Sequence, residues 1–408
     1  MHGHVAASAP TAEQRPRPRF EVADILHAHG EAFRKTHPLT AGQLKAMRNI
    51  EVCRTAVLGG HVDVCLACDF MRPAYNSCRN RHCPKCQALK QAAWIEARRE
   101  RILPTHYFHV VFTVPHELNA LALRNPVRVY DIMFAAAAET LIELAADPGR
   151  LGGLPGITAV LHTWTRTLAY HPHVHCIVTG GGLPPDAAAW IPARRRFLFP
   201  VKVMGACFRG KVLAALATAR ARGHLCFAGG CADLGDDAAF ARWKDELYRK
   251  SWVVDSRAPF GGPEQVFNYL GRYTHRVGIS NQRLISVDDR AICFATKNGG
   301  TCTLRPLDFI GRFLLHVLPS NFVKIRHFGL LAPSNVKTKL QRARDLLGPA
   351  NPVTQSDTAD PAPSSTSAWR DLFLRLTGVD LTRCPVCAGV LVSRPLPRVT
   401  LGPPPMPP

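Results

Sequence analysis

The stretch from His171 to Val178, His-Pro-His-Val-His-Cys-Ile-Val, constrains the fold more than any other part of the sequence. Its β-branched residues, followed by three glycines, predict a strand that ends in a turn. Successive side chains of a strand point to opposite faces, so the two valines and the cysteine of this stretch would form an apolar face. His173 and His175 would share the other face, about 7 Å apart, where two imidazoles can bind one divalent cation. The alternative is two polar histidines on the wet face of a half-exposed strand.

The elements that precede this strand predict an antiparallel sheet. Residues 107–114 are aromatic and β-branched, as is typical of a strand, and residues 117–147 predict a helical region interrupted at Pro126. A second strand is expected at residues 156–164, shortly before the histidine strand. The order strand, helix, strand, strand favours an α+β fold, in which helices cover one face of the sheet and the histidines lie on the open face.

A second informative stretch, residues 262–273, predicts a helix. Pro263 fits the first helical position. Gln265, Tyr269 and Tyr273 recur at i, i+4 and i+8, so they would lie along one side of that helix. The alternative is that both tyrosines border the core and bond to a neighbour or to water.

Cysteines in the first quarter of the chain predict zinc binding. The sequence holds 14 cysteines, six of them between residues 53 and 86, and its N-terminal residues lack the apolar core of an export signal. This pattern favours metal ligation in a reducing compartment over disulfides. Two Cys-x-x-Cys pairs separated by a short loop predict a tetrahedral zinc site. Its ligands would be Cys65, Cys68, Cys83 and Cys86.

Other cysteines and histidines leave the number of zinc ions open. The ligands of a second, interleaved site would be Cys53, His61, Cys78 and His82. The alternative places Cys53 in the core and His61 and His82 on the surface. Near the C-terminus, Cys384 and Cys387 form an isolated Cys-x-x-Cys pair. Two ligands cannot close a structural zinc site, so this pair needs partners elsewhere in the chain or has lost its role.

The net charge indicates a polyanionic partner. Lys and Arg outnumber Asp and Glu by 51 to 30, a formal net charge of +21, which favours nucleic acid over a merely solvated surface. Arg79, Arg81 and Lys85 lie near or between the predicted zinc ligands, where rigid knuckles could present them to DNA phosphates. No apolar run reaches membrane-spanning length, so no membrane partner is expected.

Taken together, these motifs resemble the HUH endonuclease superfamily, which is named for its His-hydrophobe-His motif. They look most like the two-tyrosine rolling-circle transposases of the insertion-sequence ninety-one type. His173-Val174-His175 matches the metal-binding motif, and Tyr269-Leu270-Gly271-Arg272-Tyr273 matches the paired tyrosines. The stretch from Cys53 to Cys86 resembles that family's N-terminal zinc-binding region. The resemblance spans roughly residues 20–345.

The resemblance implies a ferredoxin-like sheet and a metal-dependent single-strand DNA endonuclease and strand transferase. Tyr269 and Tyr273 would be the nucleophiles that form 5′-phosphotyrosine links. Arg272 borders these tyrosines, so it would either hold a phosphate or lie on a solvated helix edge. Transposon-end and target DNA would be the partners of a bacterial cytoplasmic, nucleoid-associated protein. The sequence contains no GxxxxGK[ST] phosphate loop, so unwinding would depend on host replication or helicase factors. A homo-oligomer is allowed.

The resemblance also implies two kinds of metal. Structural Zn²⁺ would bind the cysteines, and catalytic Mg²⁺ or Mn²⁺ would bind His173 and His175. Relatives take a third ligand from either of two kinds of position, which here are Gln265 and His162. Two other functions stay open: a plasmid or phage replication-initiation nuclease with the same chemistry, and a non-catalytic zinc-dependent DNA-binding protein.

The expected domain organisation follows from these motifs. Residues 1–19 would form a flexible arm, and residues 20–103 a helical lead-in and zinc-binding domain. A catalytic domain would span residues 104–349, with an insertion near 183–262. Residues 350–408 are rich in Pro, Ser and Ala and predict a largely disordered tail.

Overall fold

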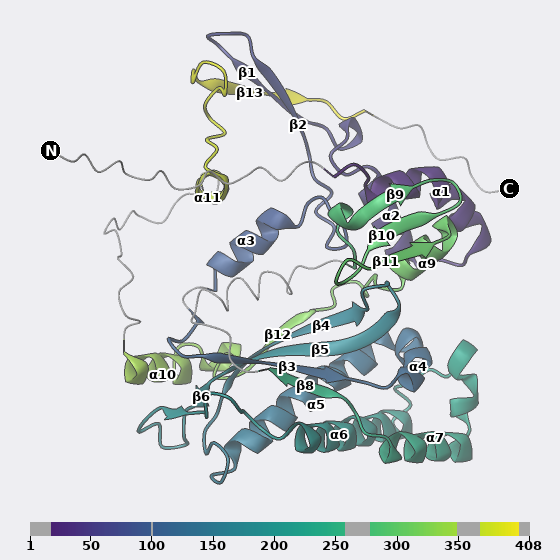
Figure 1. Cartoon of the computed structure of the whole chain (residues 1–408), viewed down its shortest axis with the longest axis vertical. Coiled ribbons are helices and arrows are strands. Elements are labelled where there is room, and N and C mark those ends of the chain that lie inside the picture. Colours follow the sequence, from purple (N-terminus) through teal and green to yellow (C-terminus); the bar gives the residue numbers. More distant parts are fainter. Residues whose placement is uncertain (1–17, 99–100, 258–277, 349–367, 400–408) are drawn as a thin grey trace.

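A five-stranded antiparallel sheet lies at the centre of the protein (Figure 1). The computed structural model describes residues 18–98, 101–257, 278–348 and 368–399. Every neighbouring pair of strands in this central sheet runs antiparallel. In sheet order the strands are β12 (Ile325–Gly329), β4 (Gly156–Trp164), β5 (Tyr170–Thr179), β3 (Tyr107–Thr113) and β8 (Val254–Arg257).

Four of these strands and two long helices make a ferredoxin-like unit. Along the chain the order is β3, α5 (Pro126–Ala146), β4, β5, α6 (Val201–Ala221) and β8, and β12 is added at the edge beside β4. The predicted α+β fold is therefore confirmed. The prediction of an insertion at residues 183–262 was wrong for α6 and β8, because both belong to the repeated strand–helix–strand plan of the unit.

The central sheet buries one face against helices. Val174, Cys176 and Val178 of β5 are fully buried in the same core as residues of α5 and α6, which lie together on this side of the sheet in Figure 1. This is the apolar face that the alternation of β5 predicts. His173 and His175 therefore point to the opposite face, where α3 (Ala88–Glu96) lies.

Local sequence signals explain where the main helices begin. Pro126 occupies the first turn of α5, where its missing N–H has no intrahelical partner to lose. The Asp236 carboxylate accepts a hydrogen bond from the Ala239 N–H at 2.8 Å and caps α7 (Asp237–Arg249). The remaining helices of this part are α4 (Asn119–Arg124) and α10 (Lys339–Leu347).

The N-terminal helices share a second core with a segment far along the chain. Helix α1 (Val22–Thr36) packs on α2 (Ala41–Glu51) and on α9 (Pro306–Leu314). Their apolar side chains meet those of a three-stranded sheet whose strands are β11 (Thr301–Leu304), β10 (Ile292–Ala295) and β9 (Leu284–Val287). The predicted boundary near residue 103 therefore does not separate two independent cores.

A third sheet joins both ends of the chain. Strand β1 (Gly60–Cys65) pairs with β2 (Met71–Tyr75) on one side and with β13 (Leu391–Leu396) on the other (Figure 1). Helix α11 (Ala368–Thr377) contacts α3. The prediction of a largely disordered tail was therefore wrong for residues 368–399, whose backbone forms a helix and a paired strand.

Short elements complete the described chain. Two-residue strands β6 (Gly181–Gly182) and β7 (Ile191–Pro192) pair with each other. Single 3₁₀ turns occur at Ala56–Leu58, His116–Leu118, Asn281–Arg283 and Pro333–Asn335, and a longer 3₁₀ segment at Gly229–Gly235 is kinked at Cys231. Within the four described ranges, none of the helices has the length and apolarity needed to span a bilayer.

Candidate metal centre and nucleic-acid interface

Three histidines converge on the open face of the central sheet. His162 of β4 lies opposite His173 of β5 in the antiparallel register, and His175 is two residues further along the same face. Their potential ligand nitrogens all lie within 4.8 Å of one another. The ring centre of His162 is 4.5 Å from that of His175, so the three imidazoles can face a single ion.

Of the two candidates for a third metal ligand, the structure describes only His162. His162 is brought to the pair because β4 and β5 are neighbours, joined by a short connection through residues 165–169. Gln265 lies outside the described residues, as do Tyr269, Arg272 and Tyr273.

Hydrogen bonds orient the histidine rings. His173 donates its Nδ1–H to the carbonyl oxygen of His171 at 2.7 Å, because a carbonyl oxygen can only accept. The Nε2 lone pair of His173 is therefore available to a metal. His175 Nδ1 is 2.8 Å from Nε2 of His109, a buried residue of β3.

His109 is a functional candidate that the sequence reasoning missed. Strand alternation would have placed it on the face opposite Phe108 and Val110, and hence beside the metal motif once β3 pairs with β5. Metal-bound histidines commonly use such a partner to fix the ring and the tautomer.

Burial keeps these imidazoles in the form that binds metals. Desolvation lowers the pKa of His173 to about 4 and that of His109 also to about 4. Both rings are consequently neutral near pH 7, and a neutral imidazole offers a lone pair without first losing a proton.

The histidines open onto a pocket of about 340 Å³ with cationic walls. Arg166, Arg257, Arg283 and Lys297 contribute to its lining, together with Trp164 and one carboxylate, Asp255. Asp255 is ion-paired with Arg257 at 2.8 Å. The remaining positive charge suits a phosphodiester backbone, and the indole offers a surface on which a base can stack. Arg257 immediately precedes residues 258–277, which contain the paired tyrosines, and Arg283 follows them closely.

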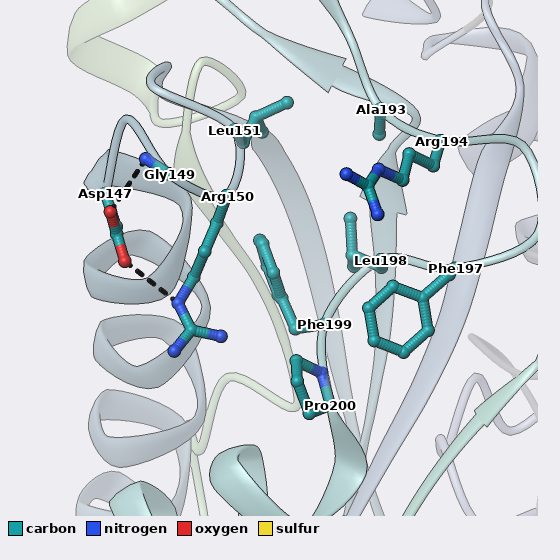
Figure 2. Close-up of a pocket in the computed structure, with 10 residues that line it drawn as sticks. All are labelled: Asp147, Gly149, Arg150, Leu151, Ala193, Arg194, Phe197, Leu198, Phe199 and Pro200. Carbon is teal, nitrogen blue, oxygen red and sulfur yellow. Dashed lines mark hydrogen bonds and ion pairs between the residues drawn. The ribbon is translucent and has the colours of Figure 1, made fainter.

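A second pocket of about 320 Å³ is similar in size but different in chemistry. It lies at the end of α5, between Arg150 on one wall and Arg194 and Phe197 on the other (Figure 2). Asp147 is its only carboxylate and is ion-paired with Arg150 at 3.0 Å. None of its lining residues belongs to a metal-ligating cluster among the described residues. Size therefore does not indicate which of these two pockets is the functional site, whereas the three histidines indicate the first one.

Four cysteines form a buried cluster beneath the N-terminal helices. This buried cysteine cluster consists of Cys53, Cys78, Cys83 and Cys86, whose sulfurs lie within 4.8 Å of one another. Cys78 Sγ is 3.7 Å from Cys86 Sγ, and Cys53 Sγ accepts a hydrogen bond from the Cys78 N–H. Hydrogen bonds from the Cys78 and Cys83 thiols lower the pKa of Cys53 to about 7. Four thiols at these distances fit a tetrahedral zinc ion.

The predicted grouping of the zinc ligands was wrong. Cys83 and Cys86 combine with Cys53 and Cys78, not with Cys65 and Cys68. The β1–β2 hairpin explains the difference, since Gly60 pairs with Tyr75 at its base. The base brings residues 53 and 78 together, whereas Cys65 and Cys68 lie at the tip, about 17 Å away by the rise per strand residue from Gly60 to Cys65.

The two histidines that were offered as zinc ligands belong to neither cysteine group. His61 Nε2 lies 3.6 Å from an Asp63 carboxylate oxygen. Burial and nearby cations lower the pKa of His82 to about 3, so this ring is neutral. Cys65 and Cys68 instead meet Cys384 and Cys387 from the other end of the chain.

The proposed phosphate contacts in this region have different surroundings. Arg81 donates to the carbonyl oxygens of Phe322 and Pro319, at 2.5 and 2.6 Å, and so joins the zinc-binding region to the loop before β12. Lys85 is half-buried and ion-paired with Glu21. Arg79 is exposed to solvent, whereas Arg81 and Lys85 are half-buried.

Comparison with known proteins places this architecture. A family described as "Putative transposase" matches residues 156–339, and one described as "Transposase zinc-binding domain" matches residues 25–114. The "Putative transposase y4qJ" of Sinorhizobium fredii is 45% identical over 395 residues, which cover 94% of this chain and 97% of that protein. The "Transposase for insertion sequence element IS801" of Pseudomonas savastanoi pv. phaseolicola is 28% identical over 369 residues, 85% and 84% of the two chains. No solved structure matches significantly.

These findings define the class of protein as a transposase with an N-terminal zinc-binding domain. Within that class, the chain belongs to the insertion-sequence ninety-one family of transposases, to which the predicted resemblance pointed. Transposases act on DNA, which agrees with the net charge of +21.

Proposed function

We propose that this transposase cuts and rejoins single-stranded DNA through 5′-phosphotyrosine links, as in rolling-circle transposition. The observation that carries the proposal is the convergence of His162, His173 and His175 at a cationic pocket. The proposed nucleophiles are Tyr269 and Tyr273. The chain enters their segment from Arg257 at the pocket and is again beside the pocket at Arg283.

In this proposal, the residues around the pocket have separate roles. The three histidines would hold Mg²⁺ or Mn²⁺, which when bound would supply polarisation of the scissile phosphate and neutralisation of developing charge. Arg166 and Lys297 hold the DNA backbone, and Trp164 supports a base. His109 positions His175 through the 2.8 Å hydrogen bond. Attack by a tyrosine hydroxyl forms the phosphotyrosine bond and releases a 3′-hydroxyl, and a later 3′-hydroxyl can reverse the step.

Two alternative functions are less well supported. A plasmid or phage replication-initiation nuclease would use the same chemistry, but the two relatives described above are named as transposases and the chain carries a transposase zinc-binding domain. A non-catalytic DNA-binding protein would have no need of three buried or half-buried histidines grouped on one sheet face.

The test is formation of a covalent protein–DNA adduct. The full-length protein would be incubated with single-stranded oligonucleotides carrying candidate element ends, with Mn²⁺ or with a chelator, and run on a denaturing gel. Wild type, Tyr269→Phe, Tyr273→Phe and the double variant would be compared, with Tyr248→Phe as a matched control because that tyrosine is exposed on α7.

The proposal expects a Mn²⁺-dependent adduct that the double variant and the chelator abolish. Loss in one single variant would make that tyrosine the primary nucleophile. An adduct that persists in the double variant would refute the nucleophile assignment. Tight DNA binding without an adduct on any end sequence would support the non-catalytic alternative.

A further inference from the structure

We infer that Cys65, Cys68, Cys384 and Cys387 form a second structural zinc site, which fastens the C-terminal segment to the N-terminal zinc-binding domain. The first two cysteines lie within residues 25–114, whereas the last two lie outside both matched family regions. These four residues are called the bridging cysteine cluster. The inference is independent of the proposed nuclease chemistry.

The sulfur spacing fits a tetrahedral metal site. All four sulfurs of the bridging cysteine cluster lie within 4.8 Å of one another. Cys65 Sγ is 3.4 Å from Cys387 Sγ, and Cys68 Sγ is 3.6 Å from Cys384 Sγ. Thiolates bound to zinc at about 2.3 Å in a tetrahedron are about 3.8 Å apart. A disulfide would need about 2.0 Å.

The two halves of the cluster have matching backbone geometry. The Ala67 N–H donates to Cys65 Sγ at 3.4 Å, and the Val386 N–H donates to Cys384 Sγ at the same distance. In each half, the N–H of the first cysteine bonds the carbonyl five residues later, Phe70 in one and Gly389 in the other.

Each half then turns at the same point. The residue after the second cysteine is left-handed, with φ of 55° at Asp69 and 56° at Ala388. That conformation is unfavourable for residues with a side chain and is kept only where surrounding structure requires it. Two loops with the same turn and the same N–H···S bonds, facing each other, are what two zinc knuckles require.

A glycine allows the knuckles to approach. A Cβ atom added to Gly389 would lie 3.2 Å from both Cys65 Sγ and Cys387 Sγ. Such a contact is tighter than normal packing, so a side chain here would push the sulfurs apart.

The C-terminal strand has little else to hold it. Every residue of β13 is exposed or half-exposed, so the strand buries little apolar surface of its own. Besides its ladder with β1, the strand makes a side-chain hydrogen bond from Ser393 to the buried Asp63 carboxylate, which Arg72 also pairs at 2.9 Å. Small sheets with thin cores commonly depend on a metal for stability.

The test is a count of zinc ions per full-length chain by native mass spectrometry. Cys384→Ser/Cys387→Ser should hold one zinc ion fewer than wild type, and Cys65→Ser/Cys68→Ser should also lose one. The quadruple variant should still lose only one, because both pairs belong to the same site. Cys226→Ser/Cys293→Ser, which alters two cysteines outside the clusters, should match wild type.

Several outcomes would overturn the inference. They are an unchanged zinc count in Cys384→Ser/Cys387→Ser, a loss of two ions in the quadruple variant, and a wild-type mass that shows disulfides among these four residues. Hydrogen exchange gives a second readout that does not depend on counting. In Cys384→Ser/Cys387→Ser, the amides of β13 should lose protection while those of β3 keep it, and equal protection of β13 in both proteins would contradict a zinc clamp.

Discussion

If the proposed metal centre is correct, replacing His109 by phenylalanine should weaken Mn²⁺ binding without removing a ligand. His109 is 4% exposed, and its Nε2 lies 2.8 Å from Nδ1 of His175. Phenylalanine has a similar ring, so it fills the site and leaves no large cavity. What the substitution removes is the hydrogen bond that orients His175 and sets its tautomer.

The expected size follows from that single lost contact. Removing an outer partner of a metal-bound histidine typically weakens metal affinity about 10- to 100-fold, or roughly 1.4–2.7 kcal/mol. His162, His173 and His175 all remain in the variant, so binding should be weakened and not abolished.

The assay is a Mn²⁺ titration of the full-length protein, following the electron paramagnetic resonance signal of the free ion. His327→Phe is a matched control, since it makes the same substitution on the same sheet. His327 bonds Thr158 through Nδ1 at 3.1 Å and does not line the histidine pocket. The dissociation constant should rise for His109→Phe and stay near wild type for His327→Phe. Equal affinity of His109→Phe and wild type, or equal weakening of both variants, would refute the reasoning.

Two further predictions concern stability. Arg81→Ala should destabilise the fold by about 1.5–3 kcal/mol, because its guanidinium donates to the carbonyls of Pro319 and Phe322, whereas exposed Arg79→Ala should change the urea midpoint little. Equal midpoints would contradict the junction role of Arg81. Burial lowers the pKa of His316 to about 4, below the ordinary value of 6.5, so the unfolded chain binds more protons between these values and stability should fall as the pH drops through that window. His316→Leu should make this fall shallower by up to about 1.4 kcal/mol per pH unit in urea unfolding, and an unchanged slope would count against the assignment.

Much of the central sheet could be predicted because its signals are local. Strand alternation placed Val174, Cys176 and Val178 in the core and the two histidines on the other face, and the structure agrees. The break at Pro126 was also correct, since α4 ends at Arg124 and α5 begins at that proline.

The parts that could not be predicted depend on contacts between distant segments. His109 reaches the histidine pair only through the register of β3 against β5, which no local pattern specifies. The register of β4 against β5 likewise brings in His162, which the sequence had offered beside Gln265 without deciding between them. The cysteine grouping failed for the same reason. Sequence spacing favoured Cys65 and Cys68 with Cys83 and Cys86, but the length of the β1–β2 hairpin separates these pairs.

The prediction of a largely disordered C-terminal tail was wrong in part because it rested on composition. The residues around 350–367 are rich in Pro, Ser and Ala, and this hid the helix and strand that follow them. The Cys384–Cys387 pair was the local signal of structure there, and its partners at the tip of a hairpin more than three hundred residues earlier could not be identified from spacing.

The most direct test of the three-histidine centre is the Mn²⁺ dependence of adduct formation in wild type, His162→Ala and Gln265→Ala. If His162 completes the site, His162→Ala should need at least about tenfold more Mn²⁺ for half-maximal adduct, because it removes a ligand, and Gln265→Ala should stay close to wild type. The opposite order, with His162→Ala like wild type and Gln265→Ala impaired, would contradict the centre that the structure assembles.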